Sequence, residues 1–240
     1  MKPIVFFRKF HKWLGLIIGL QLLLWTMGGV VMSFFDIEKV RGEVNIAKQQ
    51  VINLEQPINI SAQELLQRLD FVPTSIELKG WMGNLVWAAK SKQHYQLVDA
   101  QTGEMITPLN EDQARQVAEA DFAGKGEIAQ VVLLDEEGIK EFGEVRGRKA
   151  PLWQMQFNDE DNTRIYVSAE KGSLVARRND TWRFYDFFWM LHIMDYKERS
   201  DFNHPLLIIA ALLALFMSLS GLYLVIKLVI FKPKRAKING

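Results

Sequence analysis

The sequence predicts an α+β membrane protein, in which two transmembrane helices flank an extracytoplasmic domain of two helix-plus-antiparallel-sheet units. Two uncharged runs, one near each end, predict the spans, and a helix-then-strands pattern that occurs twice between them predicts the domain. The predicted parts, in chain order, are a cytoplasmic N-terminus (1–12), the first span (13–35), the first unit (36–109), the second unit (110–179), an interfacial aromatic segment (180–204), the second span (205–230) and a cytoplasmic basic tail (231–240).

Both apolar runs are long enough to cross a bilayer. The first run carries no charged residue, and at 1.5 Å per residue it extends about 34 Å, against a hydrocarbon core of about 30 Å. It ends in Ser33-Phe34-Phe35-Asp36 without a small-residue cleavage pattern, so we expect an anchor that stays in place and not a signal peptide. The second run, Pro205 to Ile226, has few polar interruptions, and soluble helices seldom stay uncharged for so long.

The basic residues beside the spans predict the orientation. Four of them precede the first span, and five end or follow the second: Lys2, Arg8, Lys9 and Lys12, and Lys227, Lys232, Lys234, Arg235 and Lys237. Because short cytoplasmic flanks are enriched in Lys and Arg, we expect both termini in the cytoplasm and the central domain in the periplasm of a bacterial inner membrane.

Small residues predict close packing of the two spans. They coincide in depth when the spans run antiparallel: Gly15 and Gly19 on the first, and Ala214, Ser218 and Gly221 on the second. Gln21 lies at a depth similar to that of Ser218, so we expect an interhelical hydrogen bond there. The same small-residue face could instead form a homodimer.

The central domain is predicted to repeat one design. In the first unit a capped helix over 61–69 precedes strands at 75–78, 85–89 and 94–99, and in the second a helix from Asn110 to Phe122 precedes strands at 128–134, 153–157 and 164–168. The clearest internal match joins Tyr95–Ile106 to Ile165–Val175, since each is a β-rich run, a polar turn ending in Gly and an apolar return.

These residues resemble a known family. The turns VDAQTG and VSAEKG are similar to those of PepSY modules, and the first span, HKWLGLIIGLQLLLWTMGGVVMSF, resembles the opening helix of PepSY-associated transmembrane proteins. The segment from PLWQMQF to LHIMDY, followed by SLSGLYL, is similar to the closing part of that family. The resemblance covers nearly the whole chain and implies a small periplasmic α+β domain between membrane spans.

The resemblance also raises a haem hypothesis. Larger family members have four spans, and the resemblance implies b-type haem and electron transfer to periplasmic ferric siderophores during iron uptake. The candidate axial ligands here are His192, His204 and His11.

The positions of these histidines limit the haem hypothesis. This chain has two spans, and about 30 Å of hydrocarbon separates His11 from His204, so one iron cannot bind both. A haem at the inner edge would need His11 from two chains, or a ligand from a partner; otherwise His11 is an interfacial residue beside Trp13.

The aromatic segment before the second span has two interpretations. A short helix over 180–194 can rest on the outer leaflet, where amphipathic aromatic side chains are stable. Alternatively, the segment and the loop after it hold a metal or the edge of a haem through two imidazoles and two carboxylates: His192, Asp195, Asp201 and His204. That requires 195–203 to fold back as a loop. Three nearby arginines could pair with lipid phosphates: Arg177, Arg178 and Arg183.

Composition narrows the function classes. A formal net charge of +1 gives no broad positive field, so we expect no nucleic-acid binding. The chain has no cysteine, which excludes disulfides, iron–sulfur clusters and thiolate metal sites, and no hydrolase or phosphate-loop motif occurs. We therefore expect no autonomous catalysis other than haem redox chemistry.

The leading hypothesis is an accessory module that contacts a periplasmic or membrane protein or a peptide through its sheet edges. Restraint of a peptidase is one version of this hypothesis. The alternatives are the haem electron-transfer subunit and a scaffold for a larger membrane complex.

Overall fold

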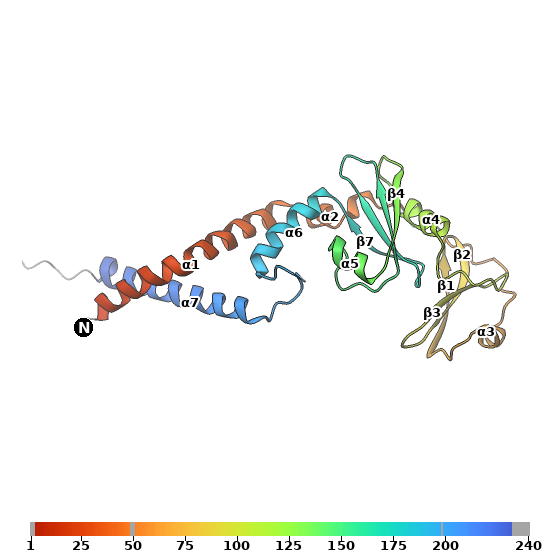
Figure 1. Ribbon diagram of the computed structural model, residues 1–240, viewed down its shortest axis with the longest axis horizontal. Coiled ribbons are helices and arrows are strands. Elements are labelled where there is room, and N and C mark those ends of the chain that lie inside the picture. The colour runs from red at the N-terminus through yellow and green to blue at the C-terminus, as the bar shows by residue number, and fades with distance from the viewer. Residues whose placement is uncertain (1–2, 49–50, 198, 232–240) are drawn as a thin grey trace, which may run out of the picture. The chain divides into compact units, whose positions relative to one another are not determined.

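The structure is a computed structural model that describes residues 3–48, 51–197 and 199–231 (Figure 1). Lys2 and the basic residues from Lys232 onward lie outside the described residues. The chain divides into two compact units: a helical unit, Met1–Phe35 with Tyr185–Gly240, and a sheet unit, Asp36–Phe184. Two antiparallel sheets lie in the chain between two long apolar helices, which confirms the predicted fold class.

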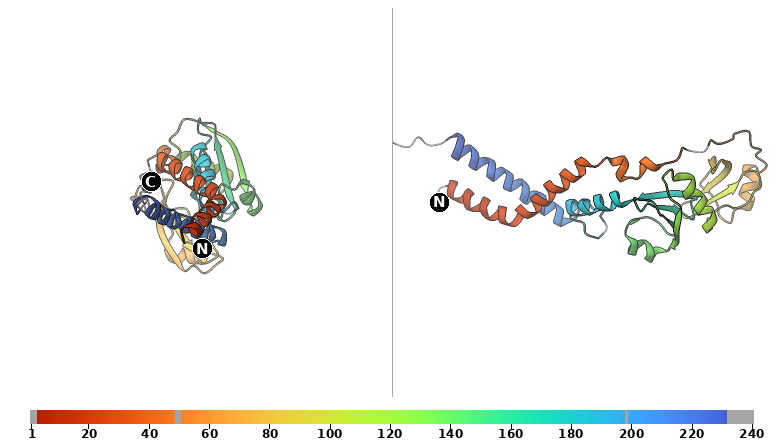
Figure 2. Two further views of the ribbon diagram at one scale, coloured as in Figure 1. Left: turned by 90° about the vertical axis from the view of Figure 1, so that its left-hand side faces the viewer. Right: turned by 90° about the horizontal axis from the view of Figure 1, so that it is seen from above.

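The helical unit contains both candidate membrane spans. They are α1 (Pro3–Phe34) and α7 (Pro205–Val225), which continues as a π-helical turn over Ile226–Ile230. Figures 1 and 2 show α7 beside the first half of α1 and running in the opposite direction. Leu14 and Ile18 pack there against Ala210 and Ala214. Most of the exposed side chains of both helices are apolar, and they form the surface that a bilayer would cover.

The contact between α1 and α7 differs from the predicted one in two places. Gly15 lies against Met217, but a side chain at Gly19 would meet nothing within 4 Å, so Gly19 makes no close contact. Gln21 does form an interhelical hydrogen bond, but its partner is the Leu191 carbonyl of α6 (Asp180–Ile193) and not α7. Depth along two antiparallel helices fixes which residues are level, but it does not fix which residues face each other.

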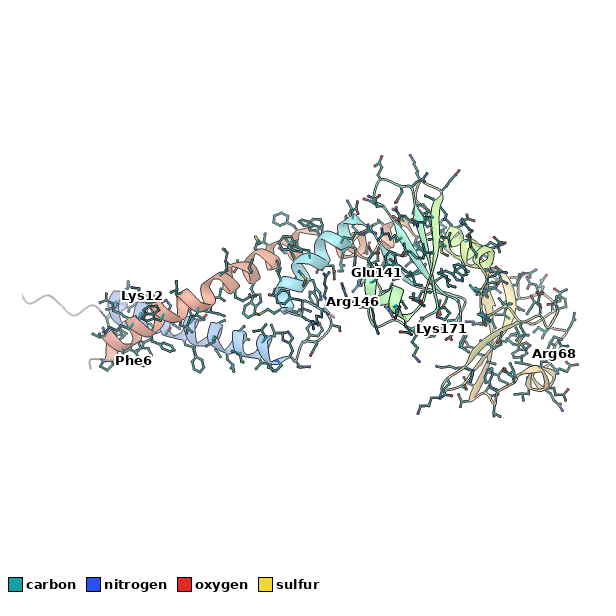
Figure 3. The ribbon with its side chains drawn as sticks, viewed as in Figure 1. Phe6, Lys12, Arg68, Glu141, Arg146 and Lys171 are labelled. Atoms are coloured by element: carbon teal, nitrogen blue, oxygen red, sulfur yellow. The ribbon has the colours of Figure 1, made fainter. Side chains whose placement is uncertain are left out.

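The first part of the sheet unit forms a small three-stranded sheet. A short helix α2 (Ile37–Val40) and a 3₁₀ turn (Glu43–Asn45) precede α3 (Ala62–Arg68), where Ser61 and Glu64 form the predicted capping box. The strands β1 (Ser75–Trp81), β2 (Asn84–Lys90) and β3 (Tyr95–Asp99) follow in the order β1-β2-β3, all antiparallel. Arg68, labelled in Figure 3, donates to the Gly103 carbonyl at 3.2 Å and so attaches α3 to the turn after β3.

The second part forms a four-stranded sheet. The helix α4 (Glu111–Asp121) precedes β4 (Ile128–Leu134), and α5 (Glu136–Phe142) lies between β4 and β5 (Leu152–Phe157). The strands β6 (Arg164–Ser168) and β7 (Ser173–Arg178) complete an antiparallel sheet in the order β4-β5-β6-β7. The predicted bounds of β4 and β6 are confirmed, whereas α5 was not predicted and β7 was predicted only as an apolar return.

Both sheets share one core. Val86 and Leu97 of the first sheet pack with Met155 and Ile165 of the second, together with the inner face of α4. Trp81 adds a hydrogen bond between the two halves, because its Nε1 donates to the Gly172 carbonyl at 2.7 Å. A second cluster, around Tyr166, Leu152 and Ile139, fills the space between the opposite face of the second sheet and α5.

Candidate functional site: the junction of α1, α6 and α7

The candidate histidines lie in two separate places along α1. His11 contacts α7 near Ser220, whereas His192 and His204 lie where α6 ends and α7 begins, beside Trp25 of α1. Fourteen residues separate His11 from Trp25 on one helix, which is about 21 Å. The structure therefore agrees with the expectation that His11 and His204 of one chain cannot bind one iron.

The end of α6 is held by three side chains. The last carbonyls of a helix have no partner inside it, and in an apolar layer they need partners from elsewhere. Here Gln21 donates to Leu191 O at 3.3 Å, Trp25 donates to His192 O at 2.7 Å, and the Nε2 of His204 lies 2.8 Å from Ile193 O. We call these three hydrogen bonds the carbonyl clamp. They allow α6 to end against the apolar surface of α1.

His204 has both ring nitrogens engaged. It is the N-cap residue of α7, and its Nδ1 accepts from the Leu207 amide at 3.4 Å. Since a carbonyl can only accept, Nε2 carries the proton that it donates to Ile193 O. Pro205 follows at the first helical position, as expected for a helix start. His204 therefore has a structural role here, and a ligand role would require it to give up one of these bonds.

His192 is different, because its Nδ1 is buried and has no hydrogen-bond partner among the described residues. Its ring lies beside Trp25, with centroids 6.2 Å apart, and any side chain at Gly28 would begin 3.8 Å from Nδ1. His192 also lines a cavity of about 440 Å³, which we call the junction pocket. The other residues lining the junction pocket are Trp25, Trp189, Ile193, Phe202, Leu207 and Ala211.

The loop between α6 and α7 folds back, as the ligand hypothesis required, but its carboxylates serve the loop itself. Asp195 accepts from the amides of Lys197, Ser200 and Asp201 at 3.0–3.2 Å. Asp186 is buried and forms an ion pair with Arg199. In the described part of the chain, no group of three or more His, Asp or Glu side chains is placed to hold a metal ion, so the His192, Asp195, Asp201 and His204 quartet is not brought together.

His11 forms a hydrogen-bonded pair with α7. Its Nδ1 lies 2.8 Å from the Ser220 hydroxyl, which donates its own proton to Met217 O at 2.8 Å. Because Ser220 uses its only proton, Nδ1 of His11 carries a hydrogen and Nε2 keeps a lone pair. Gly221 makes room for the ring, since a side chain there would begin 3.0 Å from its Cε1. Such an imidazole, with one nitrogen anchored by a hydrogen bond and a lone pair on the other, is the form in which histidine binds metals.

The arginines predicted to pair with lipid phosphates have protein partners in the sheet unit. Glu144 accepts from Arg164 at 2.9 Å, from Arg183 at 2.8 Å and from the Tyr166 hydroxyl at 2.7 Å. Arg178 donates to the Glu144 carbonyl, and Arg177 forms a double ion pair with Asp121. That prediction is therefore wrong for all three arginines: the sequence does not reveal these acceptors, because Asp121 and Glu144 lie tens of residues earlier in the chain.

Burial changes the acid–base behaviour of Arg178 and Tyr166 in this cluster. It lowers the pKa of Arg178 to about 10, although the neighbouring Glu144 carboxylate works in the other direction. Burial also raises the pKa of Tyr166, and the Glu144 charge adds to that effect. The cluster fixes the loop after α5 to the second sheet and to the first turns of α6.

Comparison with known proteins supports the resemblance seen in the sequence. The sequence model of the family described as PepSY-associated TM region matches residues 8–238. No curated protein and no solved structure matches the chain. The match covers most of the first candidate span, all of the second, both sheets and the junction between α6 and α7, so the chain belongs to the family of proteins with a PepSY-associated transmembrane region.

Proposed function

We propose that the chain is a membrane-anchored accessory protein whose sheet unit binds an extended segment of a partner protein by adding it as a strand beside β4. The single observation that carries the proposal is the outer edge of β4. Within the described residues β4 pairs only with β5, and all seven of its residues are uncharged. The Leu133 side chain is 52% exposed, and Ala129 and Gln130 are exposed as well.

The other sheet edges are protected in ways that β4 is not. Charged side chains on an edge strand discourage pairing with other chains, and β1 carries Glu77 and Lys79 while β7 carries Arg177 and Arg178. The edge of β3 is covered, because Ile106 donates to Leu97 O at 2.8 Å and Met105 forms a bridge with Val98. Only a β-bulge near Ile128 interrupts β4, and Gln130–Leu134 remain regular. An exposed, apolar, regular edge is the geometry that strand addition uses.

Anchoring at both ends favours a partner in or at the same membrane. The sheet unit lies in the chain between two helices that can each span a bilayer, so both of its ends are tethered. Tethering raises the effective concentration for partners at that surface and makes a weak edge contact sufficient. The basic flanks support cytoplasmic termini and a periplasmic sheet unit in a bacterial inner membrane.

Photo-crosslinking in living cells tests the proposal. A photoreactive residue in place of Ala129 should give a discrete adduct with another protein, whereas the same residue in place of Glu77 on the charged β1 edge should not. Leu133→Lys should reduce the Ala129 adduct, because a charge on the edge opposes strand pairing. Equal adducts from both edges, none from either, or adducts with a second copy of this chain alone would refute strand addition by a partner.

A reporter experiment tests the orientation separately. A reporter that is active only outside the cytoplasm should work when fused after Gly172 and fail when fused after Gly240. Activity at both positions, or at neither, would show that the orientation or the second span is misinterpreted.

His11 supports a second candidate, the b-haem electron-transfer subunit for ferric-siderophore reduction. Haem, when bound, supplies one-electron transfer, and the protein's part is to hold the iron. His11 Nε2 has no hydrogen-bond partner among the described residues and could hold it while Ser220 fixes the ring. A second His11 from another copy, or a partner's ligand, would complete the axial pair. His192 remains a predicted ligand with a buried, unpartnered nitrogen, whereas His204 is engaged in the carbonyl clamp.

The absorption spectrum of detergent-purified protein tests the second candidate. A Soret band at one haem per one or two chains, lost in His11→Ala and weakened in Ser220→Ala, would support it. His94→Ala serves as the control, because His94 lies in the sheet unit and stacks on Phe71. A spectrum without haem from haem-replete cells would end this candidate for the isolated chain.

A further inference from the structure

We propose that the junction pocket binds the ring of a membrane-dissolved quinone. The pocket belongs wholly to the helical unit and is lined by residues of both candidate spans, Trp25 on α1 and Leu207 and Ala211 on α7. Ala211 is exposed, so a ligand dissolved in the bilayer could enter beside it without crossing water. The inference does not depend on strand addition at β4.

The aromatic walls favour a flat ring. Trp25, Trp189 and Phe202 contribute three ring systems to a pocket of about 440 Å³, within the size range of small-molecule sites. The Trp189 and Phe202 rings meet edge to face, with centroids 5.5 Å apart. Such rings can stack on, or meet edge to face, another aromatic or quinonoid ring, and these contacts are more favourable than those with a flexible acyl chain.

The polar groups of the pocket are engaged, except for one. Trp25 Nε1 donates to His192 O at 2.7 Å and Trp189 Nε1 donates to Arg199 O at 3.3 Å, so the indoles present only apolar surface. His192 is the one side chain with an unused hydrogen-bonding atom among the described lining residues. The His192 imidazole lines the pocket and makes no side-chain hydrogen bond in the described part of the chain, so a ligand oxygen in the pocket would supply a partner for the ring.

These features together specify the ligand chemistry. It is lipophilic, flat and of modest size, and it carries an oxygen that can form a hydrogen bond with an imidazole. A quinone ring has carbonyl oxygens at its edge and an apolar tail that can remain in the bilayer. A saturated acyl chain fits the apolar walls but leaves His192 without a partner.

Binding of decylubiquinone to the full chain in detergent micelles tests the proposal, with tryptophan fluorescence quenching as the readout. His192→Leu should weaken binding about tenfold, the effect of losing roughly one buried hydrogen bond. His192→Gln, which keeps an N–H donor, should recover part of that loss. Ala211→Phe should abolish binding by filling the pocket, whereas Leu212→Phe, at the next and outward-facing position, should leave binding unchanged.

Several outcomes would overturn the proposal. Equal quenching in wild type, His192→Leu and Ala211→Phe would place the probe in the micelle and not in the pocket. Displacement of the probe by dodecanol as readily as by a second quinone would assign the pocket to acyl chains. A Soret band that disappears in His192→Leu would assign the pocket to a porphyrin. Helix content measured by circular dichroism identifies any variant that fails to fold. If His192→Leu or Ala211→Phe does not fold, the test rests on the other two variants: His192→Gln should bind more weakly than wild type, and Leu212→Phe should bind equally well.

Discussion

The two halves of the sheet unit have similar turns, but only the second half continues after its turn into a full strand. Their turns are built alike: Gly103 donates its amide to Asp99 O and Gly172 donates to Ser168 O, both at 2.9 Å, and both glycines have positive φ. After the turn, the first half returns through a single bridge between Val98 and Met105, whereas the second half continues as the full strand β7. The turn is therefore encoded locally, but the strand after it depends on what it packs against.

The two sheets differ in how well their faces are covered. The second sheet is covered on one face by the shared core and on the other by α5 and the Glu144 network, and Ile165, Tyr166 and Val167 of β6 have no exposed surface. The first sheet is covered on its α3 side only by a small cluster of Ile60, Leu65 and Val98. An additional strand buries much apolar surface where both faces of the sheet are covered, and it buries little where the cover is thin.

Removing the buried carboxylate of the second half should have the largest effect. Glu144→Ala removes the carboxylate that Arg164, Arg183 and Tyr166 share and should lower the free energy of unfolding by about 3–5 kcal/mol. Urea unfolding of the full chain in detergent measures it. Glu141→Ala, an exposed glutamate of α5 (Figure 3), should change stability by less than about 0.5 kcal/mol. Similar losses of stability in both variants would show that the Glu144 network stabilises the fold no more than an exposed glutamate does.

The small cluster of the first half should be next in sensitivity. Leu65 of α3 is fully buried, so Leu65→Ala should cost about 2–4 kcal/mol and speed hydrogen exchange of β1–β3 amides more than that of β5 and β6 amides. Leu66 is 48% exposed on the same helix, and Leu66→Ala should have little effect. Equal acceleration of exchange in both sheets would show that the halves open only together.

The two turn glycines allow a direct comparison of the halves. Alanine at either position is strained, at about 1 kcal/mol, because φ is +76° at Gly103 and +60° at Gly172. At Gly103 the added methyl would meet the Arg68 guanidinium, which can move, whereas at Gly172 it would lie 2.8 Å from Cδ1 of the buried Leu97. Gly172→Ala should therefore cost about 2 kcal/mol and Gly103→Ala about half as much, by thermal unfolding; the reverse order would contradict this account.

Tyr166 should give a smaller effect than Glu144, Leu65 or Gly172, and a pH-dependent one. Tyr166→Phe removes a hydrogen bond to a carboxylate and should cost about 1.5 kcal/mol at pH 7. Burial raises the pKa of Tyr166 above its usual value of 10.0, so above pH 10 only the unfolded chain loses the proton, and wild type loses stability as the pH rises. The Phe variant lacks that group, so the difference between the two proteins should shrink above pH 10. A difference that stays constant would exclude Tyr166 as the cause.

The sequence was most informative where contacts are local. Short β-rich runs located β4 and β6, and capping residues located α3 and α4, because residue preferences and caps act within a few residues. The helix α5 was missed, since its seven residues bury only Ile139 and give no clear period. The carbonyl clamp and the junction pocket were missed as well. Gln21 and Trp25 lie more than 160 residues from their partners, and no local pattern marks such a pair.

The carbonyl clamp implies an order for biogenesis. Its donors come from two places far apart in the chain, Gln21 and Trp25 on α1 and His204 at the start of α7, while its acceptors are made in between. During synthesis α1 emerges first and must stay in the bilayer with two unpaired donors until the whole sheet unit has followed. The end of α6 becomes stable only when α7 arrives. The clamp therefore cannot be complete until His204 at the start of α7 has been made, and a chain that lacks it leaves the last carbonyls of α6 without these partners.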